Sequence, residues 1–147
     1  MTIATVEMCI AGAIGVAAAI EDLARRTVSN WMPVALVLSG LACQGIHKGW
    51  TGAAAAMAGA AAGGGVFLVF YLLGGMGGGD VKLMAGFGAL LGAGRLVEAA
   101  FWTALMGGLF AAGVLGLAAV RKRQQTKSIP YAPAIVAGVW LTLLGRN

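Results

Sequence analysis

Stretches without any charged residue dominate the chain, and short polar clusters separate them. The uncharged stretches span residues 8–20, 27–46, 49–79, 83–94, 99–120 and 128–145. A helix needs about 20 apolar residues to cross about 30 Å of hydrocarbon. The 31 residues of 49–79 suffice for one span and a loop, whereas the 12 residues of 83–94 cross only if the preceding residues extend the helix. The pattern predicts an all-α, polytopic membrane bundle of about six transmembrane helices.

Composition supports a membrane protein. Of the 147 residues, 60% are hydrophobic and 10% are charged, whereas a soluble domain carries about 25% charged residues. The same figures exclude a disordered chain. The first basic residue, Arg25, follows the first apolar stretch, so the N-terminus lacks the basic region of a signal peptide. We therefore expect the first stretch to be a membrane helix and residues 1–147 to form a single transmembrane domain.

The basic residues are distributed unevenly between the two sides of such a bundle. Six spans place both termini on one side, together with Lys48, Arg95 and Arg146. The loops on the other side carry Arg25, Arg26, Lys82, Arg121, Lys122, Arg123 and Lys127. Because cytoplasmic loops are enriched in Lys and Arg, this second side is predicted to be cytoplasmic. The net charge of +5 does not indicate nucleic-acid binding, since the basic residues are scattered over loops without interleaved aromatic residues.

Glycine is abundant, at 25 residues, and some glycines lie four residues apart. Gly59 with Gly63, and Gly88 with Gly92, have this spacing. Small residues four positions apart let membrane helices approach closely. These pairs are therefore predicted to lie at helix contacts and by themselves indicate no activity.

Cysteine and histidine offer little chemistry in this chain. Cys9 and Cys43 would both lie toward the outer leaflet, where a disulfide is geometrically possible, but two small buried hydrophobic residues are the favoured interpretation. The only histidine is His47, in an outer loop beside Lys48, and no CxxC pair exists. Neither a zinc site nor a Ser/His/Asp or Cys/His set can be assembled, so we predict no metal and no cofactor.

The chain has only two aspartates, Asp22 and Asp80, and both fall on the predicted cytoplasmic side. An acid inside a membrane costs about 2.5 to 3.5 kcal/mol and is a candidate functional group by default. Asp22 could instead lie in headgroup water and pair with Arg25 or Arg26 one turn further on. Asp80 follows a run, residues 74–79, with five glycines in six positions, which does not sustain a stable helix. Irregular backbone near a membrane is tolerated where it lines a cavity, so Asp80 is placed at the lip of one.

Two facing carboxylates suit the hydrolysis of a peptide bond. Close like charges cannot both ionise, so the pair shares a proton. The ionised acid can deprotonate a water molecule while the protonated acid polarises the scissile carbonyl. This chemistry needs neither a metal nor a nucleophilic side chain.

The residues around the aspartates resemble the motifs of a known family. The run from Gly77 to Ala85, with Gly77, Gly78, Gly79, Asp80, Lys82 and Leu83, resembles the GxGD-x-K-L motif of the type IV prepilin leader peptidases, which are membrane aspartic proteases. Asp22, followed by Arg25, Arg26, Thr27, Val28, Ser29 and Asn30, is similar to their D-x-x-x-R-x-I-P-N motif. The segment 130–134 is similar to their Pro-aromatic-x-Pro segment. The resemblance extends from the first predicted helix to the sixth.

The resemblance implies that Asp22 and Asp80 are the catalytic pair. The residues implied to support the site or bind substrate are Gly77, Gly78, Gly79, Lys82, Arg25, Arg26 and Asn30. The implied activity is an endopeptidase that cleaves the leader of type IV, Flp-like prepilins or pseudopilins at the cytoplasmic face of the bacterial inner membrane, with both termini periplasmic. The implied partners are the prepilin substrate, the lipid bilayer and the pilus or secretion machinery.

Two departures from the family pattern carry expectations. Ser29 stands where the family has proline, and this change is expected to loosen the turn while leaving Asp22 in place. The larger family members also have a cytoplasmic insert with paired CxxC motifs and a methyltransferase activity, which is absent from this sequence. The resemblance therefore implies a short form that cleaves without N-methylation, of the kind associated with Flp-type pili and tight-adherence secretion systems.

Two questions stay open at this point. The first is whether the chain is instead a non-enzymatic small transporter or assembly scaffold, because glycine-broken helices with intramembrane acids also occur in transporters. The second is the role of Lys82. It can mark the membrane boundary as flanking lysines do, or it can pair with the acidic residue that the family's substrates carry shortly after the cut.

Overall fold

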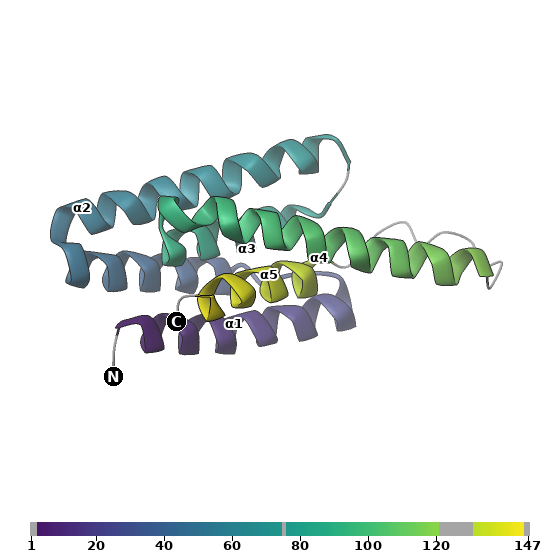
Figure 1. Cartoon of the computed structure of the whole chain (residues 1–147), viewed down its shortest axis with the longest axis horizontal. Coiled ribbons are helices and arrows are strands. Elements are labelled where there is room, and N and C mark those ends of the chain that lie inside the picture. Colours follow the sequence, from purple (N-terminus) through teal and green to yellow (C-terminus); the bar gives the residue numbers. More distant parts are fainter. Residues whose placement is uncertain (1–2, 75, 121–130, 146–147) are drawn as a thin grey trace.

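The computed structural model describes residues 3–74, 76–120 and 131–145, and within these ranges the only regular elements are helices. They are α1 (Ile3–Arg25), α2 (Trp31–Leu72), α3 (Gly78–Leu91), α4 (Ala93–Val120) and α5 (Ala132–Leu144). The predicted all-α class is confirmed. The start of α1 and the end of α5 lie toward one end of the molecule, and the α1–α2 and α2–α3 connections lie toward the other (Figure 1).

Helix α2 reverses its direction at Gly49. This residue has φ 60° and ψ −141°, a backbone conformation that glycine adopts without the steric cost of a Cβ atom. Figure 1 shows the two legs of α2 running back along each other from this point. The legs correspond to the predicted stretches 27–46 and 49–79, so the structure contains five helices in its described part and not six separate ones.

The described residues contain one helix, Trp31–Leu72, that is long and apolar enough to cross a membrane, and a shorter apolar helix, Ala132–Leu144. The fourth predicted stretch, 83–94, is extended by the preceding motif residues, since α3 begins at Gly78. The 14 residues of α3 rise about 21 Å, which is less than the thickness of a bilayer core.

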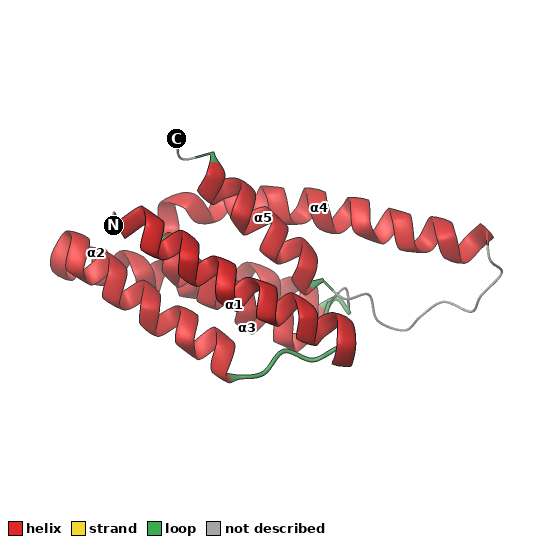
Figure 2. Cartoon of the chain, turned by 90° about the horizontal axis from the view of Figure 1, so that it is seen from below, coloured by secondary structure: helices red, strands yellow, loops and turns green. Residues whose placement is uncertain are grey.

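Helix α3 lies in the centre of the bundle and packs most extensively against α2. Leu83, Met84, Phe87 and Leu90 of α3 are all fully buried. The connection to α4 is made at Gly92, which has φ 74°. Helices α1 and α5 lie side by side (Figure 2), and each of them also contacts α3. The packing of the buried side chains of α3 fixes the position of Asp80, which lies in the first turn of this helix.

The predicted glycine contacts are confirmed where α2 crosses α3. A Cβ atom built on Gly59 would meet the carbonyl oxygen of Gly88, and one built on Gly88 would meet that of Gly59. A Cβ atom built on Gly63 would lie 2.7 Å from the carbonyl oxygen of Met84. One built on Gly40, in the first leg, would meet the main chain of Ala89. Both legs of α2 therefore approach α3 at main-chain distance, which only glycine permits.

Candidate active site

Asp22 and Asp80 line one pocket, although 58 positions separate them in the sequence. Asp22 lies near the end of α1 and Asp80 in the first turn of α3. Both side chains are buried, with exposed fractions of 6% and 5%. The pocket has a volume of about 240 Å³ and is lined by Asp22, Arg26, Thr27, Val28, Asn30, Gly77, Gly78, Gly79, Asp80 and Lys82. The structure thus brings together the two acids that the sequence singled out.

Each carboxylate accepts a hydrogen bond from a main-chain N–H that belongs to another motif residue. The N–H of Ala132, the first residue of α5, donates to Oδ2 of Asp22 at 3.2 Å. The N–H of Gly77 donates to Oδ2 of Asp80 at 3.3 Å. Ala132 belongs to the segment 130–134, so this third motif contributes directly to the position of the first acid. This contact was not predicted from the sequence.

The described glycines of the run adopt three different conformations. Gly74 has φ 76° and Gly77 is extended, with φ −81° and ψ 151°. Gly78 and Gly79 already belong to α3, so the prediction that the whole run is non-helical was wrong for these two residues. A Cβ atom on Gly79 would lie 3.2 Å from Cβ of Val28, so a side chain here would crowd the α1–α2 loop, although the φ of Gly79 is not unusual.

The two carboxyl groups differ in their acidity. Asp22 lies in the last turn of α1 and Asp80 in the first turn of α3. Burial and, secondarily, the negative charge of Asp22 raise the pKa of Asp80 to about 6, although the Gly77 N–H opposes this shift. Burial also raises the pKa of Asp22, against the lowering effects of the Ala132 N–H and the Arg26 charge. Asp22 has two neighbouring groups that favour its ionised form, whereas Asp80 faces a like charge. A proton shared by the pair is therefore expected on Asp80.

Residues 9–117 match the family described as the type IV leader peptidase family. The chain belongs to this family. It is 44% identical over 71 residues to a prepilin leader peptidase/N-methyltransferase of Bacillus subtilis, a match that covers 48% of this chain and 27% of that protein. A protein of the same description from Aeromonas salmonicida is 39% identical over 70 residues, which cover 48% of this chain and 23% of that protein. The chain therefore matches about a quarter of the length of these curated relatives. No solved structure matches it.

Ser29 stands where the type IV leader peptidase pattern has proline, and it is hydrogen-bonded to a residue near the end of α1. Its N–H donates to Oε2 of Glu21 at 3.1 Å, and its hydroxyl donates to Oε1 of the same carboxylate at 2.6 Å. These two hydrogen bonds lower the pKa of Glu21. Proline has neither donor. The loop after Asp22 is therefore tied back to the end of α1, next to the first acid.

Replacing Ser29 with alanine is expected to lower the midpoint of thermal unfolding at pH 7, because the hydroxyl bond to a carboxylate is lost. When folding lowers the pKa of a carboxyl group, that group stabilises the folded protein at pH values above its ordinary pKa. This stabilisation is lost as the pH falls through the pKa of the folded state. The difference between variant and wild type should therefore shrink on acidification below the ordinary glutamate range. Ser39→Ala is the matched control, since Ser39 bonds only the Ala35 carbonyl within α2. An equal, pH-independent loss in both variants would contradict the tie to Glu21.

Lys82 and Asn30 meet on the wall of the pocket. The ammonium group of Lys82 donates to Oδ1 of Asn30 at 2.9 Å and so joins α3 to the start of α2. Arg26 also lines the pocket, whereas Arg25 does not. The positive charge of Arg25 instead contributes to the lowered pKa of Glu21. Thr27 and Val28 also line the pocket. Both belong to the motif that follows Asp22, but neither was predicted to be a site residue.

The two cysteines do not line the pocket. Cys9 and Cys43 are free thiols. Cys9 is exposed, so the interpretation of both as buried hydrophobic residues was wrong for it. Within the described residues, no three His, Cys, Asp or Glu side chains are grouped as a metal site requires. The basic residues Arg121, Lys122, Arg123, Lys127 and Arg146, with Pro130 of the third motif, lie outside the described residues.

Proposed function

We propose that the chain is an aspartic endopeptidase that hydrolyses the leader of a type IV, Flp-like prepilin or pseudopilin. The single observation that carries this proposal is the convergence of Asp22 and Asp80, both buried, on one pocket. Membership of the type IV leader peptidase family supports it. The names of the relatives combine this activity with N-methylation, and we propose cleavage alone for this chain, whose two cysteines form no CxxC pair.

The proposed mechanism divides the work between the two acids. Ionised Asp22 takes a proton from a water molecule as the water oxygen bonds to the scissile carbonyl carbon. Protonated Asp80 gives its proton to the carbonyl oxygen, which produces a neutral tetrahedral intermediate. When the C–N bond breaks, the proton on Asp22 passes to the leaving amine, and Asp80 recovers its proton as the carbonyl re-forms. The N–H groups of Ala132 and Gly77 hold the two carboxylates in place throughout.

We place the chain in the bacterial inner membrane as a multi-pass protein with both termini periplasmic and the aspartates on the cytoplasmic side. Large apolar side chains are exposed along the bundle, including Leu38 at 61%, Leu72 at 74% and Phe101 at 63%. Such surfaces are unusual for a protein in water and fit contact with lipid. Reporter fusions at residues 121–127 are expected to report a cytoplasmic position, and a periplasmic report there would contradict this orientation.

The test of the proposed function is a cleavage assay with the purified protein in detergent or liposomes and a prepilin substrate. Release of the leader, identified by mass spectrometry of both products, is the expected result. A folded protein that cuts no prepilin would remove the proposal and leave the alternative of a non-enzymatic transporter or scaffold.

Lys82→Gln is expected to distinguish two roles of this residue. If Lys82 only marks the membrane boundary, cleavage kinetics should be nearly unchanged. If Lys82 pairs with the acidic residue of the substrate, Lys82→Gln should cleave a normal prepilin several-fold more slowly, because a surface ion pair is worth about 1 kcal/mol. The substitution should then have a much smaller effect on a prepilin whose early acid is neutralised. We favour the second role because Asn30 holds the ammonium on the pocket wall. Equal effects on both substrates would leave only the boundary role.

A further inference from the structure

Arg26 has a backbone conformation that is unfavourable for arginine. It follows the last residue of α1, and its φ of 54° is the one positive value outside glycine in the described part of the chain. Its N–H donates to the carbonyl of Asp22 at 2.8 Å, an arrangement in which helices usually end on glycine. A side chain in this conformation brings Cβ too close to the following carbonyl oxygen. Strained residues of this kind concentrate at functional sites, where the strain serves the mechanism.

The side chain of Arg26 is exposed and lines the aspartate pocket, in which Asp22 is buried. The proposed mechanism needs Asp22 in its ionised form. Burial raises the pKa of Asp22 and so opposes this form, whereas the Ala132 N–H and the Arg26 charge lower the pKa. Of these two favourable groups, only Arg26 acts through its side chain.

Helix α3 supplies the other charged residues that line the pocket, Asp80 and Lys82. Asp80 carries no charge in the protonated form that the proposed mechanism requires. The ammonium group of Lys82 donates to Asn30 and pairs, in the role that we favour, with the acid of the substrate. Arg26 is therefore the cation left to act on Asp22.

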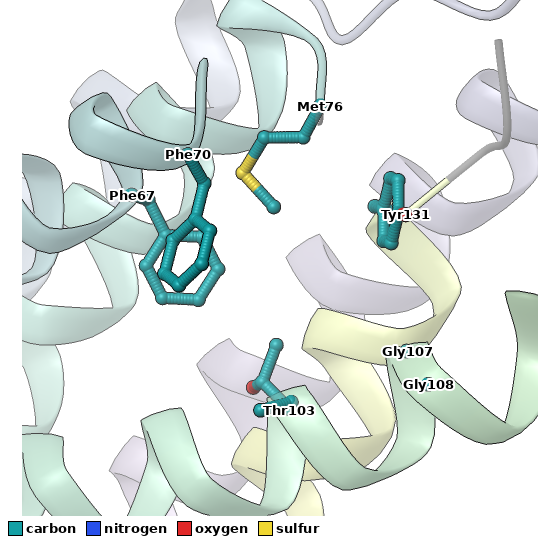
Figure 3. Close-up of a pocket in the computed structure, with 8 residues that line it drawn as sticks. Phe67, Phe70, Met76, Thr103, Gly107, Gly108 and Tyr131 are labelled. Carbon is teal, nitrogen blue, oxygen red and sulfur yellow. The ribbon is translucent and has the colours of Figure 1, made fainter. Parts of the chain in front are cut away.

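The other charged and titratable groups near Asp22 are engaged elsewhere. On α1, the Glu21 carboxylate accepts two hydrogen bonds from the α1–α2 loop, and the charge of Arg25 acts on this same carboxylate. Helix α5 carries no charged side chain, and α2 carries none before Lys48. The ring of Tyr131, the residue before α5, lies in a separate apolar cavity (Figure 3) and does not line the aspartate pocket.

We propose that Arg26 is a positioning residue that keeps Asp22 ionised as the base, and that the chain retains a strained backbone at Arg26 for this purpose. This inference rests on the proposed function and assigns a role to one further residue of the same site. Glycine would adopt the conformation without strain but would remove the charge. The alternative is that Arg26 only stabilises the C-terminus of α1, as basic residues there do.

The experiment measures kcat/KM against pH for the wild type, Arg26→Gln and Arg26→Lys. In the wild type, kcat/KM rises as Asp22 loses its proton and falls as Asp80 loses its proton, at about pH 6. Arg26→Gln is expected to move the rising limb to higher pH, because the ionised base loses a neighbouring positive charge. On that limb kcat/KM should fall by up to about 5-fold, as when one exposed charge is removed from another. Arg26→Lys keeps the charge and should keep the rising limb of the wild type.

Arg95→Gln is the matched control, since Arg95 lies in the first turn of α4 and does not line the pocket. A rising limb that Arg26→Gln leaves in place, or that Arg95→Gln moves equally, would overturn the inference, while wild-type cleavage would still uphold the proposed function. A loss that is equal at every pH would also overturn it, because Arg26 would then act only on the structure of α1. So would a loss that disappears with a prepilin whose early acid is neutralised, because Arg26 would then bind substrate.

Arg26→Gly removes the same charge and also relieves the strain. It is expected to unfold at a higher temperature than the wild type, because glycine adopts a positive φ without steric cost, and to move the rising limb as Arg26→Gln does. This variant therefore tests the role of the charge even if Arg26→Gln fails to fold. An Arg26→Gly protein that unfolds at a lower temperature than the wild type would overturn the proposal that the backbone at Arg26 is strained.

Discussion

Replacing Asp80 with asparagine is expected to abolish leader cleavage, and replacing Asp22 with asparagine to do the same. Asparagine keeps the shape of the side chain but can neither give a proton to the carbonyl oxygen nor take one from water. Loss of one member of a catalytic unit commonly costs on the order of 10⁴- to 10⁶-fold in rate. The double variant should be little worse than either single one, because the two acids act as one unit. The measurement is the rate of leader release by purified variants.

The unfolding temperature is the control for these variants. Asp80→Asn is expected to lose activity without losing stability. The pKa of Asp80 is raised to about 6 in the folded protein, so the folded state favours the protonated form. The associated stability is fully present below the ordinary aspartate pKa and is lost as pH rises through about 6. Asp80→Asn lacks this loss and should unfold at the same or a higher temperature than the wild type at pH 7. A stable Asp80→Asn protein with substantial cleavage would end the aspartic-protease proposal.

Gly59→Ala is expected to be strongly destabilising, although it adds one methyl group. That methyl would meet the carbonyl oxygen of Gly88 on α3, where no side chain can move aside. Separating two packed helices by the width of a methyl group costs about 1 to 3 kcal/mol or more. The measurement is the unfolding temperature in detergent together with the amount of protein in the membrane.

Gly65→Ala is the matched control for Gly59→Ala, since it lies on the same leg of α2 and a Cβ there has no atom within 4 Å. This control variant should be neutral or slightly more stable, because alanine favours helix over glycine by up to about 1 kcal/mol. Equal stability of the two variants would mean that α2 and α3 do not approach at main-chain distance.

The sequence predicted which residues carry the chemistry of the site better than it predicted the contacts that hold them in place. The two aspartates were identified because an acid in such an apolar chain is costly, and the motifs around them resemble one family. The hydrogen bonds between Ser29 and Glu21 were not predicted. Both residues are ordinary polar residues eight positions apart, and nothing local indicates that a loop folds back to join them.

The length and polarity of segments are properties of consecutive residues, so the sequence alone determined the helical class and the approximate helix positions. It also determined which residue types were available for catalysis. Only the tertiary structure decided that Gly49 reverses α2, that Ala132 bonds Asp22 across 110 positions, and that Asp22 and Asp80 line one pocket. Each of these depends on how helices pack against one another, because a hydrogen bond or a cavity between distant segments exists only after those segments have been brought together.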